Sequence, residues 1–402
     1  MNFLKKMKVY FLAVFFAAST FWSCQPKQEP LVELIKDRLS RSTEQSLLMA
    51  AALADQPRNL PRTVNAEGGL ETSRSSWWCS GFFPGLLWYL YEYDKSEALL
   101  DYARNYTARV EREKYNKGTH DLGFMLYCSF GNGFRLTGDT AYVSVMLAGA
   151  ESLATRFNPL IGCLKSWDHN KDKWQFPVIV DNMMNLEFLF WASKTSGDSK
   201  YRDICISHAD NTIRDFYRPD YSSYHVVSYD TISGQPEKKN TAQGFSDESA
   251  WARGQAWGLY GFTVMYRETR DAKYLDHATN IAAFLLSHPN LPDDKIPYWD
   301  FNAPDIPDAL RDASAGAIIA SALIELSGYV DNKLAKTYIE VAEKQIRTLS
   351  SPDYFAETAT NANFILKHSV GSIPHGSEVD VPLTYADYYY VEALLRLLAS
   401  DF

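Results

Sequence analysis

The chain has 402 residues, of which 46% are hydrophobic and 22% are charged. This composition can bury a large core, and it excludes a disordered chain or an integral membrane bundle. With 40 Lys and Arg against 49 Asp and Glu, the net charge is −9. An acidic chain disfavours non-specific binding to phosphate backbones, so we expect no nucleic acid partner.

The first 24 residues are typical of an export signal. Three lysines among the first eight residues precede the apolar run Val9–Trp22, which is too short to remain as a membrane-spanning helix. Ser23–Cys24 and a polar stretch follow, and this pattern resembles a bacterial lipoprotein signal with Cys24 as the lipidated N-terminus. Ordinary secretion is the alternative. We therefore expect residues 1–24 to be a lipoprotein-type signal segment and the protein to be exported, in the periplasm or as an outer-membrane lipoprotein of a Gram-negative bacterium.

Cysteine spacing and acidic motifs give no sign of a metal site. The cysteines beyond the signal segment are Cys79, Cys128, Cys163 and Cys205. They show no C-x-x-C spacing, and three lie in apolar segments, so buried free thiols are expected rather than disulfides or metal ligands. Asp168–Asp172 begins like a calcium loop, but Lys173 stands where that loop needs Gly and Ile179 stands where it needs Glu. We therefore predict no metal.

A recurring turn indicates a repeat of helical hairpins. It is clearest at Thr137–Tyr142, Ser196–Tyr201 and Thr269–Tyr274, and the copies are 59 and 73 residues apart. An aromatic and small-residue run precedes each copy, and an amphipathic stretch with helical spacing follows it. At this period the mature chain holds roughly six hairpins.

Six hairpins could form an open solenoid or a closed ring. An open solenoid leaves its end repeats unburied unless special capping repeats cover them. We therefore predict an all-α fold, an (α/α)6 barrel, in which apolar helices form an inner wall and amphipathic helices an outer wall. Residues 25–402 are expected to form this single domain.

Polar residues recur at equivalent places in the expected inner helices. Counting back 17 or 18 residues from the three clear turns reaches Asp121, Asp181 and Arg253, and the weaker turns give Asp312 and Trp77. Taken singly, each acid could be an ordinary N-cap or first-turn residue. Because all inner N-termini face the same end of a ring, we predict that these side chains surround one opening and form a functional site.

Asp121 and Asp181 should differ in protonation if they share one pocket. Asp181 follows the apolar run 176–180, so desolvation should raise its pKa. Asp121 follows His120 and is expected to carry a charge more readily. Asp181 is therefore the candidate general acid, and Asp121 is the charged neighbour that keeps it protonated or orients it.

The polar segment 217–254 is predicted to be a loop over the opening. Within it His225, Thr241 and Gln243 can supply hydrogen bonds. Long loops of this kind in compact domains are often functional. The segment therefore adds candidate binding residues to the two acids.

Aromatic and cationic residues follow this loop. Trp251 and Trp257 could present aromatic faces to a sugar ring, and Arg253 suits a carboxylate on that ring. Trp257 could instead be a core residue, and a core position is favoured for Trp78 and Trp88. Arg253 could instead form a structural salt bridge with a carboxylate of the ring of helices. An anionic sugar is thus the ligand that the residues favour.

Several motifs taken together resemble the unsaturated glucuronyl hydrolases of glycoside hydrolase family 88. The likeness begins near Trp77 and runs in order to the C-terminus. It is carried by His120–Phe124, Val180–Asn185, Trp251–Trp257, Gly376–Leu383 and Tyr385–Tyr389.

The resemblance implies an (α/α)6 barrel that removes the 4,5-unsaturated uronic acid left by polysaccharide lyases at the non-reducing end of oligosaccharides. It implies no metal or organic cofactor. Asp181 matches the family's acid/base and Asp121 its second essential carboxylate. The implied substrate contacts are His225, Thr241, Gln243, Trp251, Arg253 and Trp257, together with Ser369 and Ser372, which lie where sulfate-accepting relatives contact the substrate.

The implied reaction is hydration of the C4=C5 vinyl ether rather than ordinary glycosidic displacement. One alternative is an unsaturated rhamnogalacturonyl hydrolase acting on pectin fragments, and a second is a non-catalytic sugar-binding lipoprotein. No Lys follows Lys367, although some sulfate-tolerant relatives use a Lys just after the serines, so weak acceptance of sulfate is expected. Fragments of chondroitin, hyaluronan and heparin are all possible substrates at this point, and the sequence does not determine the oligomeric state.

Overall fold

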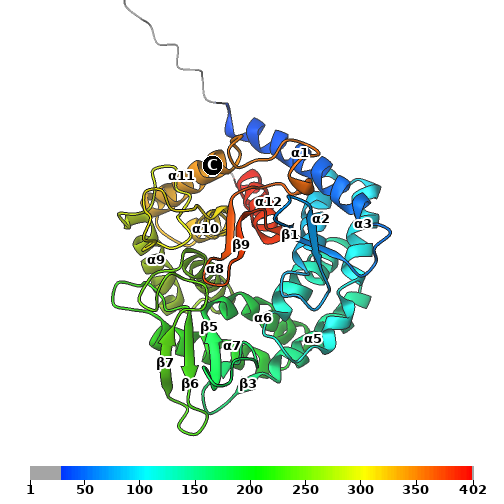
Figure 1. The fold of residues 1–402 in the computed structure, drawn as a ribbon. Helices are drawn as coiled ribbons and strands as arrows, with labels where there is room; N and C mark the ends of the chain where they lie inside the picture. The colour runs from blue at the N-terminus through cyan, green and yellow to red at the C-terminus, as the bar shows by residue number, and fades with distance from the viewer. Residues whose placement is uncertain (1–28, 401–402) are drawn as a thin grey trace, which may run out of the picture.

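The computed structural model describes residues 29–400, in which two concentric rings of helices surround a central axis (Figure 1). The inner ring consists of α2 (Phe82–Asp94), η2 (Gly123–Gly131) continued by α4 (Asn132–Thr137), α6 (Leu186–Ser196), α8 (Ala252–Thr269), α10 (Ala313–Ser327) and α12 (Thr384–Ala399). The outer ring consists of α1 (Leu31–Ala52), α3 (Glu97–Ala108), α5 (Ala141–Ala154), α7 (Ser199–Phe216), α9 (Ala272–Ser287) and α11 (Asn332–Leu349). The predicted (α/α)6 barrel is confirmed.

The ring closes through the two ends of the described chain. The last inner helix, α12, packs against both α10 and α2, and the first outer helix, α1, lies against α2 and α12 (Figure 1). Five helical pairs are therefore consecutive hairpins, whereas the sixth joins α1 to α12. This closure buries the surfaces that an open solenoid would expose.

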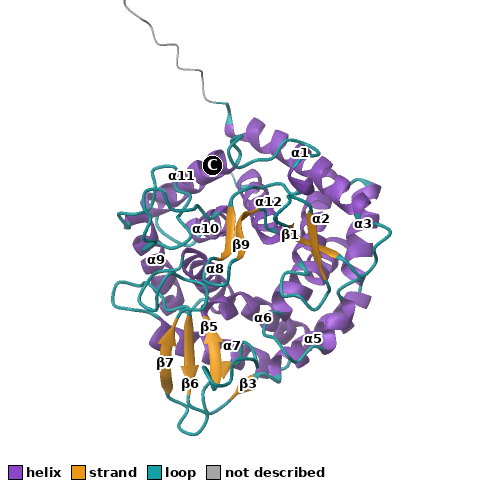
Figure 2. Ribbon diagram, viewed as in Figure 1, coloured by secondary structure: helices purple, strands orange, loops and turns teal. Residues whose placement is uncertain are grey.

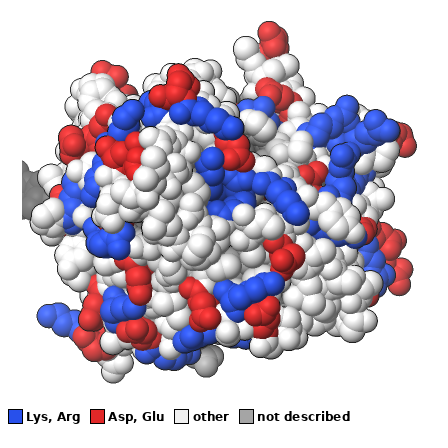
Figure 3. All heavy atoms as spheres, turned by 90° about the horizontal axis from the view of Figure 1, so that it is seen from below, with Lys and Arg blue, Asp and Glu red and all other residues white. Residues whose placement is uncertain are grey.

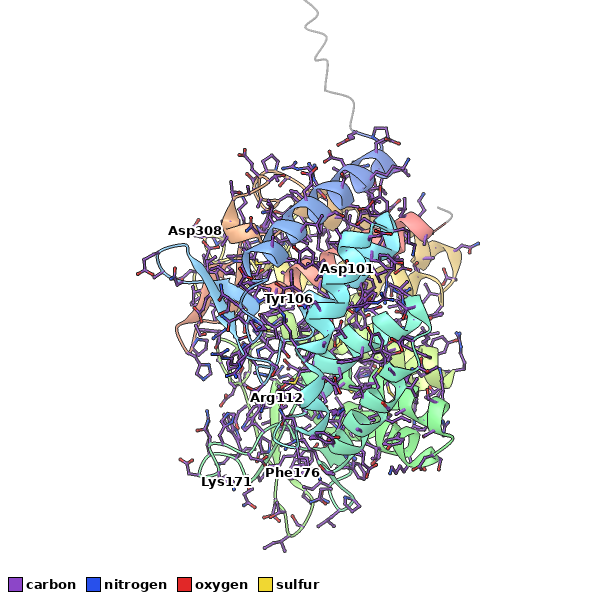
Figure 4. The ribbon with its side chains drawn as sticks, turned by 90° about the vertical axis from the view of Figure 1, so that its right-hand side faces the viewer. Asp101, Tyr106, Arg112, Lys171, Phe176 and Asp308 are labelled. Carbon is purple, nitrogen blue, oxygen red and sulfur yellow. The ribbon has the colours of Figure 1, made fainter. Side chains whose placement is uncertain are left out.

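Apolar patterning separates the two walls. In α10 every residue except Glu325 is buried, as expected of a helix with neighbours on all sides. In the outer helix α3, Asp101 is exposed, whereas Tyr106 is buried and its hydroxyl donates to the Ala50 carbonyl of α1 at 2.8 Å (Figure 4). One polar and one apolar face thus place α3 in the outer wall.

The recurring turn motifs end inner helices and begin outer ones. Gly138 and Gly197 have φ of 68° and 75°, a backbone conformation that glycine adopts without strain. The Asp198 side chain then accepts from the Lys200 N–H, and Asp271 accepts likewise from Lys273, so both are N-caps. The predicted hairpins are thus confirmed.

Short antiparallel strands, which the sequence did not predict, lie at one end of the barrel (Figure 2). The predicted loop 217–254 contains two of them, and they extend a sheet that begins just before Asp181. The pairs are β1 (Leu60–Val64) with β2 (Leu70–Ser73), β3 (Phe157–Asn158) with β4 (Cys163–Leu164), and β8 (Ser369–Ser372) with β9 (Ser377–Val381). The strands β5 (Phe176–Ile179), β6 (Val226–Tyr229) and β7 (Pro236–Asn240) form a three-stranded sheet in that order. The 3-10 helices are η1 (Glu111–Tyr115), η3 (Val180–Asn185) and η4 (Asn361–Asn363), whereas η2 is a π-helix.

The cysteines have the state that the sequence predicts. The four described cysteines, from Cys79 to Cys205, are buried and unpaired, as predicted.

On the face shown in Figure 3, acidic and basic side chains are interspersed, so the negative charge forms no continuous patch there. Within residues 29–400 no helix combines the length and apolarity that crossing a bilayer requires. The signal segment and Cys24 lie outside the described residues.

Candidate active site

The N-terminal ends of neighbouring inner helices surround a pocket of about 340 Å³. Asp121 lies two residues before η2, Asp181 lies in η3 before α6, and Arg253 lies in the first turn of α8. The predicted gathering of these residues at one opening is therefore observed. The lining residues are Ser76, Trp77, Trp78, Gly118, Thr119, His120, Asp121, Ser166, Trp167, His169, Ile179, Asp181, Gln243 and Arg253.

Asp181 is a buried carboxyl group whose pKa is raised into the neutral range. Its side chain is 13% exposed, and burial raises its pKa to about 7. The Asp121 carboxylate raises this pKa further, whereas the Arg253 guanidinium and the Trp257 side chain lower it. The direction of the shift is the one expected from the apolar run that precedes Asp181.

Asp121 is held by polar neighbours on its own loop. The Thr119 hydroxyl donates to its Oδ2, and Nε2 of His120 lies 3.2 Å from its Oδ1. Burial lowers the pKa of His120, so the imidazole is neutral. These contacts orient Asp121 in the pocket that it shares with Asp181.

His225 lies beside Asp181 in a defined tautomer, although its Nε2 and Oδ2 of Asp181 are too far apart for a hydrogen bond. Burial lowers the pKa of His225 to about 3, so the ring is neutral. Nδ1 accepts from the N–H groups of Ala242 and Gln243, at 3.1 and 3.2 Å. A nitrogen that accepts carries no proton, so the proton is on Nε2, which lies 3.6 Å from Oδ2 of Asp181.

The loop residues have different positions. The Gln243 side chain lines the pocket and donates to the Gly371 carbonyl at 3.1 Å. The Thr241 hydroxyl instead accepts from the Gly244 N–H at 2.7 Å, and Thr241 is not among the lining residues. In this structure Thr241 supports the loop rather than the pocket wall.

Arg253 forms the structural salt bridge considered as an alternative, and it also lines the pocket. Its Nη1 donates to Oδ2 of Asp312 at 3.1 Å, which is the structural salt bridge. Further donors bind the carbonyls of Val370 and Gly371 in β8. Nε and one Nη2 hydrogen have no acceptor among the described residues, and this is the edge that can bind a carboxylate in bidentate fashion.

The tryptophans occupy positions that the sequence predicted only in part. Trp251 and Trp257 are buried and do not line the pocket, so the core alternative for Trp257 describes its position. Trp88 is in the core as expected. The expectation for Trp78 was wrong, because it is only half-buried and lines the pocket with Trp77, which is 39% exposed.

Ser369 and Ser372 lie in β8 beside this opening. Both are buried, and neither is among the residues that line the pocket. The Ser372 hydroxyl lies 2.7 Å from Nδ1 of His375, whereas Oγ of Ser369 has no partner among the described residues. Their hairpin reaches the site through the Arg253 contacts with Val370 and Gly371.

Comparison with known proteins agrees with this geometry. The profile of Glycosyl Hydrolase Family 88 matches residues 55–397. The chain belongs to glycoside hydrolase family 88. It is therefore an enzyme, and the non-catalytic sugar-binding alternative is wrong.

Individual relatives cover most of the chain. An unsaturated glucuronyl hydrolase of Formosa agariphila is 48% identical over 340 residues, 84% of either chain. An unsaturated chondroitin disaccharide hydrolase of Streptococcus agalactiae is 32% identical over 324 residues, 79% of this chain and 81% of its own. The crystal structure of an unsaturated glucuronyl hydrolase specific for heparin superposes with a TM-score of 0.86 at 48% identity, covering 90% of this chain and 97% of the other.

Sequence reasoning missed part of this family 88 pocket. Trp167 and His169 stack with ring centroids 5.3 Å apart and line its wall. His169 belongs to the segment that imitates a calcium loop and Trp167 directly precedes it, and rejection of that motif left their aromatic character unused. Asp312 was found by the count, but only the fold shows that it binds Arg253.

Proposed function

We propose that this enzyme removes the 4,5-unsaturated uronic acid from the non-reducing end of lyase-generated oligosaccharides of the glycosaminoglycan type. One observation carries the proposal. Asp181, with a pKa of about 7, can donate a proton near neutral pH, and a second carboxylate, Asp121, lies in the same pocket. Protonating an enol ether requires such an acid.

In the proposed reaction Asp181 protonates C4, and the positive charge that develops at C5 is shared with the ring oxygen. Water then adds to C5 and gives its proton to the Asp181 carboxylate, which restores the acid. The product is a hemiketal at C5. Its ring opens to a C5 ketone, and the hemiacetal left at C1 releases the remaining oligosaccharide as an alcohol.

Neighbouring side chains support this sequence. The negative charge of Asp121 favours the protonated form of Asp181 before the first step. The His225 Nε2–H lies 3.6 Å from Oδ2 of Asp181, and a donor at this position would favour the Asp181 carboxylate between the two steps. The free edge of Arg253 would bind the uronate carboxylate, and Trp78 would cover the apolar face of the ring.

The substrate class rests on the named relatives. They are hydrolases of unsaturated glucuronyl or chondroitin disaccharides, which favours the glycosaminoglycan type over the rhamnogalacturonyl alternative. The structural relative at 48% identity is described as specific for heparin, whereas the chondroitin enzyme is 32% identical. Heparin-type unsaturated disaccharides are therefore the preferred candidates, with weak acceptance of sulfate near Ser369 and Ser372.

A panel of lyase-made unsaturated disaccharides tests this function. The disaccharides should differ in linkage and sulfation and include a pectin-derived one, and loss of the vinyl-ether absorbance measures turnover. We expect the highest kcat/KM on heparin-type disaccharides with little sulfate. A preference for the pectin-derived disaccharide, or no turnover of any, would refute the proposal.

We also propose that the protein is exported and lipidated at Cys24. The basic, apolar and Ser-Cys pattern of residues 1–24 supports this assignment. In cells that express the full chain, Cys24→Ala should move the protein from the membrane fraction to the soluble periplasmic fraction. An unchanged distribution would contradict lipidation.

A further inference from the structure

The buried carboxylate of Asp300 holds the loop that reaches His225. Asp300 pairs through its backbone with Trp251, which places its side chain under this loop. Its Oδ2 accepts from the Phe245 N–H at 2.9 Å and from the Ser249 hydroxyl at 2.7 Å. The side chain is fully buried, and within the described part of the chain it forms no salt bridge. An ionisable group buried at this cost without a cation calls for a specific role.

The loop that Asp300 holds also supplies the two amides that set the His225 tautomer. Phe245 follows Gln243 by two residues, and the Gly244 N–H between them binds the Thr241 hydroxyl. The turn is therefore tied at both ends while the N–H groups of Ala242 and Gln243 point at Nδ1 of His225. Any movement of this turn changes the partners of Nδ1.

We propose that Asp300 is a positioning residue that latches this turn against His225 and so keeps the proton of His225 on Nε2, the nitrogen next to Asp181. The inference rests on the proposed function, because it gives Asp300 a part in the proton transfer of that same site. Asp300 touches neither the pocket nor Asp181, and it acts through the turn and His225.

The latch matters because the two tautomers of His225 have opposite effects on Asp181. With the proton on Nε2, His225 presents a donor, which favours the carboxylate that must accept the proton of the attacking water. Without the two amides, the proton can move to Nδ1, and the Nε2 lone pair would then face Oδ2 of Asp181. That arrangement disfavours the carboxylate and the step that depends on it.

The remaining groups that act on Asp181 are Asp121, Arg253 and Trp257. None of them is a hydrogen-bond partner of Asp300, whose side-chain acceptors bind Phe245, Ser249 and Asn302 and no other residue of the range 29–400. A second path leads through Trp251, the backbone partner of Asp300, which packs against both His225 and Arg253, so the ¹⁵N signals of His225 are needed to identify the path through the loop.

Asp300→Asn tests the latch in the full chain. Asparagine keeps the size of the side chain, but it has one acceptor oxygen where Asp300 uses two, so an amide N–H must face either the Phe245 and Ser249 donors or the Asn302 N–H, and the remaining bonds lose their charge. We expect kcat to fall about tenfold, the effect of losing one charge-assisted hydrogen bond, with KM nearly unchanged. The alkaline limb of kcat/KM should move to higher pH. In ¹⁵N spectra, Nδ1 of His225 should change from wholly unprotonated to partly protonated.

Two further variants make the test decisive. Ser249→Ala removes one of the two bonds to Oδ2 and should give a smaller change of the same kind, which also decides the matter if Asp300→Asn does not fold. Asp331→Asn is the matched control, because Asp331 likewise accepts two backbone N–H groups, at the start of the outer helix α11. It should leave rates and spectra unchanged.

Unchanged ¹⁵N signals of His225 together with an unchanged pH profile in both loop variants would overturn the latch. A fall in kcat without either change would show a purely structural role and would also overturn it. Because the spectra need no substrate, they report on the latch even if the disaccharide panel refutes the proposed function.

Discussion

Nη1 of Arg253 lies 3.1 Å from Oδ2 of Asp312, and this ion pair joins the first turn of α8 to the N-cap of α10. The two side chains are 1% and 0% exposed. Asp312 also accepts from the N–H and hydroxyl of Ser314, so the carboxylate is saturated with donors. The pair therefore fixes the guanidinium edge that faces the pocket.

Replacing Arg253 separates its structural role from its binding role. Arg253→Ala leaves Asp312 buried without its cation, which should cost about 3–5 kcal/mol of unfolding free energy, measured in urea. Arg253→Ala combined with Asp312→Ala should recover part of that loss. KM for the anionic disaccharide should stay raised in both variants, because the carboxylate partner is missing. A double variant with wild-type KM would contradict the binding role.

Asp181→Asn should abolish turnover without abolishing binding. The amide cannot donate the proton to C4, so kcat should fall by roughly 10²–10⁴-fold. Calorimetry with an unsaturated disaccharide should still detect binding close to that of the wild type. A variant that removes the vinyl-ether absorbance at a near-normal rate would show that Asp181 is not the acid.

The same substitution should make stability less dependent on pH. Because folding raises the pKa of Asp181 from 3.8 to about 7, the folded state binds more protons than the unfolded state between these values. Wild-type stability from this group therefore falls as pH rises from about 4 to about 7. Asparagine does not titrate, so the Tm of the variant relative to the wild type should rise across this range. A constant difference would argue against the shift.

Asp121→Asn should move the alkaline limb of kcat/KM to lower pH. The Asp121 charge raises the pKa of Asp181, so its removal lets Asp181 lose its proton at lower pH. Activity should fall at pH 7 and recover in part at lower pH. Asp172→Asn, an exposed change of the same net charge, should leave the profile unchanged. An unshifted limb in Asp121→Asn would mean that the two carboxylates do not interact.

Gln45→Ala should weaken the closure of the barrel. The Gln45 amide on α1 donates to the carbonyls of Thr360 and Phe364, both at 3.0 Å, and accepts from the Ala359 N–H. Loss of these bonds leaves buried backbone groups unpaired, which should cost about 1–3 kcal/mol in urea unfolding. Gln56→Ala, an exposed change just beyond the same helix, should cost less than about 0.5 kcal/mol. Equal effects of the two changes would show that this contact does not hold the ring.

The sequence predicts those features of the fold and the site that are local and repeated along the chain. Helical spacing, the recurrence of one turn and the position of Asp121, Asp181 and Arg253 relative to that turn predict the hairpins and the side of the barrel where the acids meet. The apolar run before Asp181 also predicts the direction of its pKa shift, because the strand formed by that run is buried next to the acid.

Features that depend on contacts between distant segments required the tertiary structure. The join of α1 to the segment before α12 links residues 319 apart, such as Gln45 and Phe364. The Arg253 partners in β8 and the amides that fix His225 likewise come from segments whose spacing relative to the helices follows no repeat. Sequence alone therefore determined the barrel and the identity of its acids, because helix periodicity and hairpin length are local. Only the folded chain decided which donors surround them, because burial and hydrogen-bond partners depend on how loops without periodicity pack together.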